Sequence, residues 1–368
     1  MIRSFLKSYI GYKTKEKYIV LESDDWGSIR MPSREVFEIL KTNGLAFENN
    51  RYQKFDTLAN EKDLTDLFDV LHSVKDINGN PAKMTPVSVV ANPDYKKIEA
   101  TGFKEYHYEL FTDTLKKRGK EKVLQLWREG IDGGFFVPQY HGREHLNVAK
   151  WMKALQAGDE KTLFAFNHGV YGVPLSQGQT YLAAYDYFEP AELQLLKNIS
   201  EDGLNRFEEV FGFRAGYFVP PNGPLSSRLH SSLNRFGIKA IQTAHFIYHE
   251  PAGYGKTRKR IRYFGMKNRD GQIYMLRNAI FEPSEPGEKN RVENCLQQIE
   301  NAFRYNKPAI ISSHRVNFIG ALDSKNRDSG LGQLHELLQN ILKKWPEVQF
   351  LTSGELTELM INKRNDHK

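Results

Sequence analysis

Short apolar runs recur along the chain, and stretches with helical spacing of apolar residues separate them. A short run bounded by polar or glycine-containing turns is typical of a buried strand, whereas apolar residues spaced by three and four positions are typical of an amphipathic helix. The runs predicted as strands are residues 18–21, 86–91, 135–137, 163–166, 216–219, 239–242, 272–276, 309–311 and 348–351. The clearest predicted helices are residues 61–74, 204–211, 291–305 and 333–344.

Strands that alternate with helices favour right-handed βαβ crossovers and a mainly parallel sheet. Roughly seven to nine such units predict an α/β fold of the closed or nearly closed β/α-barrel type rather than an open sheet. No low-complexity linker or internal repeat divides the chain, so we predict one domain over residues 1–368. We interpret the aromatic-rich segment at about 146–205 as an insertion that elaborates the barrel, and we predict that the polar tail 362–368 is disordered.

The composition is that of a soluble globular protein, with 40% hydrophobic and 26% charged residues. The formal net charge is +7, and basic residues are densest at 256–262. We interpret this run as a solvated loop, and binding of an anionic substrate or a membrane surface is the alternative. Because no nucleic-acid-binding signature accompanies the run, no nucleic-acid partner is predicted.

The N-terminal residues 1–7 contain no sustained apolar stretch, so we predict no signal peptide and no stable membrane insertion. A cytoplasmic location is therefore expected. The only cysteine, Cys295, excludes an intramolecular disulfide framework and a metal site built from several thiolates.

Two adjacent carboxylates, Asp24 and Asp25, follow the first apolar run. Such crowding of negative charge is costly unless a cation or a shared proton relieves it. One hypothesis is therefore a metal ligand beside a catalytic base. The alternative is a polar turn in which one aspartate caps the next helix.

Further polar residues lie next to other predicted strands. His141 and His145 are four positions apart after run 135–137, and on one face of a helical turn both rings could reach a single divalent cation. His314 follows run 309–311, at the rim where β/α barrels gather their active-site residues, although a hydrogen-bonded core histidine is the alternative. Arg214 precedes run 216–219 and is either a surface residue or a partner that orients a carboxylate and lowers its pKa.

In this order the segments resemble the motifs of the polysaccharide deacetylase family, the NodB-homology fold of the family-4 carbohydrate esterases. Residues 23–27 read Ser-Asp-Asp-Trp-Gly, similar to the family's Thr-Phe-Asp-Asp-Gly, and residues 141–145 match His-Ser/Thr-x-x-His. Residues 213–223, with Phe-Arg and a later Pro-Pro-Asn-Gly, resemble the Arg-x-Pro motif. Residues 310–314 resemble the family's apolar strand that ends in histidine, and residues 348–356 its final strand and helix start.

The resemblance implies a distorted (β/α)7 barrel and a role for each matching residue. It implies that Asp24 is the catalytic base, that His314 is the general acid and that Arg214 positions the base. It implies that the metal, usually zinc, is held by three ligands, Asp25, His141 and His145. The residues that we expect to contact the substrate are Trp26, Tyr140, Tyr217, Pro221, Asn222 and His168.

The sequence also departs from the family pattern. Trp26 stands where the family has glycine, and Arg214 is followed by Ala-Gly rather than by x-Pro. The family's fourth motif, Asp-x-x-Asp-Trp, is not found after run 239–242, where residues 243–246 read Thr-Ala-His-Phe. These departures indicate a divergent subfamily with an unusual substrate.

The function predicted from the sequence is a metal-dependent hydrolase that removes an acetyl group from an N- or O-acetylated sugar or glycan, such as a precursor in surface-polysaccharide biosynthesis. Two alternatives stay open. One is a hydrolase that cleaves a small amide or another C–N bond on the same scaffold. The other is a glycan-binding module whose catalytic site is degenerate.

Overall fold

A nine-stranded sheet forms the centre of the protein in the computed structural model, which describes residues 10–175, 179–251, 257–287 and 289–365. The strand order is β10-β7-β6-β5-β2-β1-β12-β11, with β13 beside β1, and all strand pairs within this sheet are parallel. The strands are β1 (Tyr18–Trp26), β2 (Met84–Val89), β5 (Gln139–Gly142), β6 (Tyr217–Phe218), β7 (Ala240–Gln242), β10 (Ile273–Met275), β11 (Ala279–Ile280), β12 (Ala309–His314) and β13 (Gln349–Phe350).

The two ends of this strand order meet in the chain itself. β10 pairs with β7, β11 pairs with β12, and only residues 276–278 separate β10 from β11. The pair therefore acts as one interrupted strand that contacts both of its neighbours. Asn278 stabilises the break, since its side chain donates to Pro308 O at 2.8 Å and accepts from Ile310 N at 2.8 Å. With β10 and β11 counted as one strand, seven strands follow one another around a distorted barrel, and β13 pairs with β1 outside this order. The predicted fold class is confirmed.

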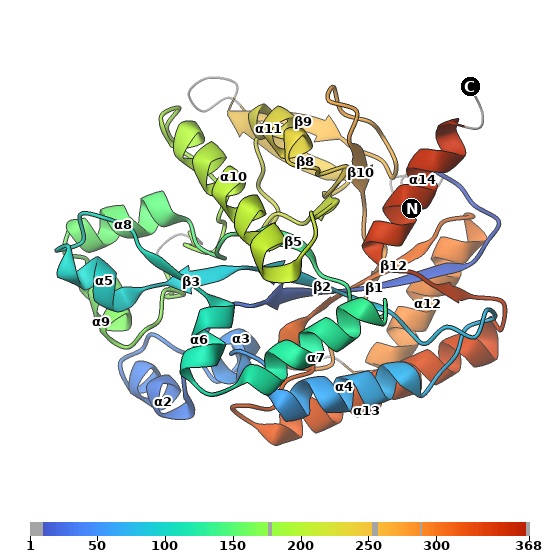
Figure 1. Ribbon diagram of the computed structural model, residues 1–368, viewed down its shortest axis with the longest axis horizontal. Coiled ribbons are helices and arrows are strands. Elements are labelled where there is room, and N and C mark those ends of the chain that lie inside the picture. Colours follow the sequence, from blue (N-terminus) through green and yellow to red (C-terminus); the bar gives the residue numbers. More distant parts are fainter. Residues whose placement is uncertain (1–9, 176–178, 252–256, 288, 366–368) are drawn as a thin grey trace.

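Helices surround the barrel (Figure 1). Helices α12, α13, α4 and α7 contact one another in that order and cover one side, and α10 lies against β5 on another side. The helices are α2 (Arg34–Thr42), α3 (Arg51–Phe55), α4 (Glu61–His72), α5 (Tyr95–Ala100), α6 (Phe111–Lys117), α7 (Glu121–Asp132), α8 (Val148–Gln156), α9 (Glu160–Asn167), α10 (Glu192–Phe211), α11 (His230–Arg235), α12 (Arg291–Arg304), α13 (Ser324–Lys344) and α14 (Ser353–Asn365).

Successive side chains of β1 point alternately to the outside and the inside of the barrel and belong to two different apolar clusters. Ile19 and Leu21 pack against the outer helices, whereas Tyr18 and Val20 pack inside the barrel. Residues of α14 complete the inner cluster with Leu356 and Met360, so this helix helps to close the end of the barrel at which the strands begin. The opposite end, where the strands finish, is left for polar side chains.

The predicted insertion is largely helical. It contains α8, α9 and the first part of α10, and Figure 1 shows α8 and α9 grouped with α5 at one side of the barrel. Buried residues of α8 and α9 share one apolar cluster with residues of α2 and α5, which gives the insertion its own contacts beside the barrel. The prediction of a single domain stays a prediction.

Several local predictions are wrong. Run 163–166 lies in α9 rather than in a strand, because its apolar residues pack into the insertion's cluster. The strand expected at 135–137 begins later, as β5 (Gln139–Gly142), so it includes the first histidine. The tail does not begin at 362, since α14 extends to Asn365, and residues 366–368 lie outside the described residues.

The basic run is not a loop where it is described. Residues 257–261 form β9 (Thr257–Ile261), which pairs antiparallel with β8 (Phe246–Pro251), and residue 256 lies outside the described residues. A second antiparallel pair joins β3 (Ala91–Pro93) to β4 (Tyr108–Leu110). None of the helices in the described parts of the chain has both the length and the apolar character needed to cross a bilayer.

Candidate metal centre

The end of β1 is irregular, and this irregularity places two adjacent aspartates in one cavity. Successive side chains of a regular strand point to opposite faces, so Asp24 and Asp25 would normally diverge. The pairing of β1 with β2 shifts register between Ser23 and Trp26, and Asp25 has a φ of 74°. A positive φ at a non-glycine residue is costly and is concentrated at functional sites. Here the bulge turns Asp25 so that it lines the same cavity as Asp24.

Asp25 converges with the two histidines predicted as metal ligands. One atom of each of Asp25, His141 and His145 lies within 4.8 Å of the others, and all three residues are buried. Asp25 Oδ1 is 3.3 Å from His141 Nε2 and 3.2 Å from His145 Nε2. The histidines do not share a helical turn as predicted, because His141 lies in β5 and His145 lies in the loop that follows it.

These distances fit one small divalent cation. Ligand atoms at about 2.0–2.1 Å from a tetrahedral centre are about 3.3 Å apart, close to the separations of Asp25 Oδ1 from the two ring nitrogens. A set of one carboxylate and two imidazoles is typical of zinc and leaves coordination positions open for other ligands. Asp25, His141 and His145 could therefore hold the ion.

Neighbouring groups orient the three side chains. The Nδ1 atom of His141 lies 2.7 Å from Val219 O and donates to this carbonyl as Nδ1–H, which leaves the Nε2 lone pair directed at Asp25. Arg30 Nη2 is 3.1 Å from Asp25 Oδ2, so the two carboxylate oxygens face different partners. Burial opposes ionisation of Asp25, but Arg30 and His145 hold its pKa well below the usual range. Burial and Arg30 lower the pKa of His145 to about 4, so it is neutral near pH 7, as a metal ligand must be.

Asp24 is paired with an arginine that is not the predicted one. Arg277 Nη1 and Nη2 are each 2.6 Å from one oxygen of Asp24, and Arg277 Nε is 2.5 Å from Glu22 Oε2. Burial alone would raise the pKa of Asp24, but Arg277 lowers it below the ordinary value. The prediction for Arg214 is corrected, because its side chain is 65% exposed and pairs with Glu208 on the surface.

His314 lies at the end of β12, beside Asp24. Its Nε2 is 4.0 Å from Asp24 Oδ2, and its Nδ1 is 2.6 Å from Glu282 Oε1. Burial opposes protonation, but Glu282 outweighs it and raises the pKa of His314 to about 9. Arg51 and Asn317 bind the second oxygen of Glu282 at 2.6 and 2.7 Å, which fixes the carboxylate that holds the ring.

The three proposed ligands, Asp24, His314 and the two arginines that pair with the aspartates line one cavity of about 340 Å³ at the end of the barrel where the strands finish. Such a position agrees with the usual location of active sites in β/α barrels. The lining residues are Asp24, Asp25, Arg30, Tyr52, His141, His145, Leu182, Val219, Pro220, Asn222, Gly223, Gln242, Ala244, Arg277 and His314.

Among the six predicted substrate contacts, only Asn222 lines this cavity. Trp26 is buried in the outer core against Trp127 and Phe136. Tyr140 and Tyr217 are also buried; the first has its hydroxyl beside Tyr185 and the second donates to Glu22.

The other two predicted contacts also lie elsewhere. Pro221 is a buried turn residue next to the lining residue Pro220. His168 ends α9, with its Nδ1 at 2.8 Å from Phe164 O, and lines a different cavity on the outside of the barrel. It does not follow a strand, so the reason for assigning it to the site is removed.

The charged residues at the site that escaped the sequence analysis include Glu22, Arg30, Arg277 and Glu282. Arg277 directly follows the predicted strand 272–276. His314 is a candidate because it follows a predicted strand, and the same criterion also selects Arg277. Glu22 precedes Asp24 on the same inward-facing side of β1, two positions earlier. Glu282 follows β11, a strand too short to be predicted.

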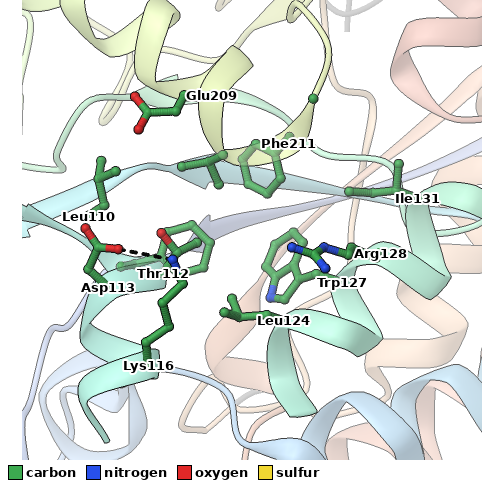
Figure 2. Close-up of a pocket in the computed structure, with 13 residues that line it drawn as sticks. Leu110, Thr112, Asp113, Lys116, Leu124, Trp127, Arg128, Ile131, Glu209 and Phe211 are labelled. Carbon is green, nitrogen blue, oxygen red and sulfur yellow. Dashed lines mark hydrogen bonds and ion pairs between the residues drawn. The ribbon is translucent and has the colours of Figure 1, made fainter. Parts of the chain in front are cut away.

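A second depression lies outside the barrel, between α6, α7 and the end of α10 (Figure 2). Its volume is about 360 Å³, and its apolar lining residues include Trp127 and Phe211. Lys116 and Asp113 lie at its edge, 3.5 Å apart. Its thirteen lining residues include no histidine, so this depression lacks the ligand set found at the end of the barrel.

Comparison with known proteins gives remote structural similarity only. No family model matches the sequence, and no curated protein matches it. A solved structure described as a polysaccharide deacetylase, from Mycobacterium smegmatis, is similar with a TM-score of 0.46 and 10% identity, over 96% of this chain and 94% of that one.

Two other similar structures carry different descriptions. A 4-alpha-glucanotransferase from Thermococcus litoralis aligns with a TM-score of 0.45 and 12% identity, over 93% of this chain and 40% of that one. BA3943 from Bacillus anthracis, a CE4 family pseudoenzyme, aligns with a TM-score of 0.39 and 10% identity, over 93% of this chain and 66% of that one. Because similarity at this level does not decide activity, the function has to be argued from the site.

Proposed function

We propose that the protein is a metal-dependent hydrolase that removes an acetyl group from an N- or O-acetylated sugar or glycan. The observation that carries this proposal is the convergence of Asp25, His141 and His145 in one cavity that Asp24 and His314 also line. Asp24, the proposed base, and His314, the proposed acid, are each held by an ion pair with another residue.

A divalent cation bound by the three ligands, zinc by the chemistry of the donor set, would polarise a carbonyl oxygen and lower the pKa of water. Asp24 is the side chain proposed to accept the proton from the attacking water. Arg277 keeps Asp24 ionised and fixes both of its oxygens, so the carboxylate cannot rotate away from the reacting group. Glu22 in turn holds Arg277 in place.

His314 is proposed to give a proton to the leaving nitrogen or oxygen of the sugar. Its raised pKa of about 9 keeps the ring protonated near neutral pH, as a general acid requires. Since His314 Nε2 and Asp24 Oδ2 are 4.0 Å apart, acid and base reach the same small volume. Glu282 fixes the ring orientation through Nδ1.

The acetylated sugar is supported by the order of the sequence motifs, which resembles the polysaccharide deacetylases. The positive net charge of +7 would favour an anionic carrier of the sugar. If the predicted cytoplasmic location is correct, a precursor in surface-polysaccharide biosynthesis is the substrate class that we propose.

The test combines metal content with turnover. Purified wild-type protein should contain about one zinc or similar ion per chain by elemental analysis and should release acetate from a panel of N- and O-acetylated sugars. Asp25→Ala should lose both the ion and the turnover. Asp24→Asn should keep the ion and lose turnover by about 100-fold or more, because only the proton acceptor is removed.

Asp113→Asn, on the outer surface, is the control and should change neither quantity. A protein that binds acetylated sugars without metal and without turnover would instead be a glycan-binding module. Turnover of small amides but not of acetylated sugars would indicate the C–N hydrolase.

A further inference from the structure

The candidate site has a buried floor and one exposed side. The proposed base and the three proposed ligands are at most 5% exposed. Among the fifteen lining residues, the exposed ones are Asn222, Gly223 and Ala244, which follow β6 and β7. The most exposed part of the cavity lining is therefore on the side of these two strands.

The insertion supplies part of the wall through Leu182. The two residues that flank Leu182 are bound to Asn147. Asn147 N donates to Tyr181 O at 2.6 Å, and Asn147 Nδ2 donates to Ala183 O at 3.2 Å. Asn147 lies two residues after the proposed ligand His145. Leu182 is thus attached on both sides to the loop that carries a ligand and is a fixed wall.

Helix α3 supplies a further part of the wall through Tyr52. The ring of Tyr52 packs edge-on against that of His314, with centroids 5.3 Å apart, and its hydroxyl accepts from Arg51 Nη2 at 2.9 Å. Arg51 itself is bound to Glu282, which holds His314. This wall is therefore connected to the proposed acid.

The volume of about 340 Å³ is near the lower end of the range for ligand cavities, about 300–1,000 Å³. Such a space suits one acetylated sugar ring. An internal residue of a polymer also needs a path for the chain on each side of it. The exposed lining residues all follow β6 and β7, whereas Tyr52 and Leu182, on the other sides of the cavity, are only partly exposed.

We propose that the cavity takes a single acetylated sugar residue end-on, so that the substrate is a terminal residue or a monosaccharide on a small group rather than an internal residue of a glycan chain. This inference rests on the proposed deacetylase function. It assigns Leu182 and Tyr52 as the side chains that exclude a continuing chain.

The test uses fully acetylated sugar oligomers of increasing length, starting with a monosaccharide glycoside, with an isotope label at one end. Tandem mass spectrometry of the products then identifies which residue has lost its acetyl group. Wild-type protein should release acetate from the monosaccharide and from one terminal residue, with internal residues slower by about 100-fold.

Leu182→Ala should raise the ratio of internal to terminal deacetylation by about tenfold, because it removes a side chain that blocks the continuing sugar chain. Leu163→Ala is the matched control, since Leu163 packs against the same apolar cluster but does not line the cavity, and it should leave the ratio unchanged. Deacetylation of internal residues by the wild type at the terminal rate would overturn the inference and leave the deacetylase function standing. Absence of turnover on every acetylated sugar, with metal bound, would contradict the proposed function and the inference with it.

Discussion

At the scale of single residues, the site depends on how two adjacent aspartates acquire different partners. Asp24 is held by Arg277 and Asp25 by Arg30, and both arginines lower the pKa of their carboxylate against the effect of burial. The sequence predicts different roles for the two aspartates, with a polar turn as the alternative, because adjacent ionised carboxylates need separate compensation. The structure gives them different arginine partners. The sequence does not suffice to identify Arg277, which is 253 positions away from Asp24.

The arginine assignment can be tested directly. Arg277→Lys keeps the positive charge but removes the two-pronged contact, so we expect kcat to fall by about 100-fold with the fold retained. Arg277→Met leaves Glu22 and Asp24 buried without a cation and should also lower the free energy of unfolding by about 3–5 kcal/mol. Arg214→Met is the control and should change neither kcat nor urea unfolding. Loss of activity in Arg214→Met together with an active Arg277→Lys would restore the original assignment.

A second prediction concerns the pKa of His314. Glu282 raises this pKa to about 9, and a general acid loses activity as the pH rises through its pKa. Glu282→Gln removes the negative charge and should move the alkaline limb of the kcat profile to lower pH. Glu285→Gln is the matched control, because Glu285 pairs with Arg51 and is 48% exposed. Identical alkaline limbs in wild type and Glu282→Gln would show that another group sets that limb.

At the scale of elements, strand β1 was predicted as an apolar run, but the bulge at its end was not. A bulge depends on the sign of φ at Asp25 and on the neighbouring strand β2, and no local apolar pattern encodes either. The only local sign of the bulge in the sequence is Gly27. Its φ is +83°, and a Cβ there would lie 2.2 Å from Val89 O, so the backbone at this position requires glycine. Trp26 does not line the cavity, because it is buried in the outer core.

Gly27→Ala should therefore disturb the carboxylates of β1. We expect weaker metal binding by calorimetry and a lower free energy of unfolding in urea, because the backbone of β1 must move away from Val89. Gly44→Ala is the control, since Gly44 also has a positive φ, +69°, but a Cβ there would meet nothing within 4 Å. It should cost only about 1–2 kcal/mol and leave metal affinity unchanged. Equal losses in the two variants would mean that close packing at Gly27 is unimportant.

At the scale of the whole molecule, the alternation of apolar runs and helical stretches was sufficient to predict a β/α barrel. The prediction was wrong at 163–166, where the apolar segment is part of helix α9 and packs in the insertion's own cluster instead of joining the sheet. It also could not show how the barrel closes. The interrupted strand β10–β11 changes partner from β7 to β12, and Arg277 lies in the three-residue break. Barrel closure and the position of the arginine are therefore one structural feature.

The same architecture predicts that metal binding stabilises the whole fold. Asp25 lies near the end of β1, His141 lies in β5 more than one hundred residues later, and His145 lies in the loop after β5. An ion would therefore join the end of β1 to β5 and its following loop. An ion that binds only the folded chain, at a free concentration about 100 times its Kd, adds about 2.7 kcal/mol to the free energy of unfolding. For a chain of this size we expect zinc to raise Tm by about 3–4 °C over chelator-treated protein. His141→Ala should abolish the shift, whereas His168→Ala should retain it, because His168 lies outside the cavity. An equal shift in both variants would show that the ion stabilises the protein at another place.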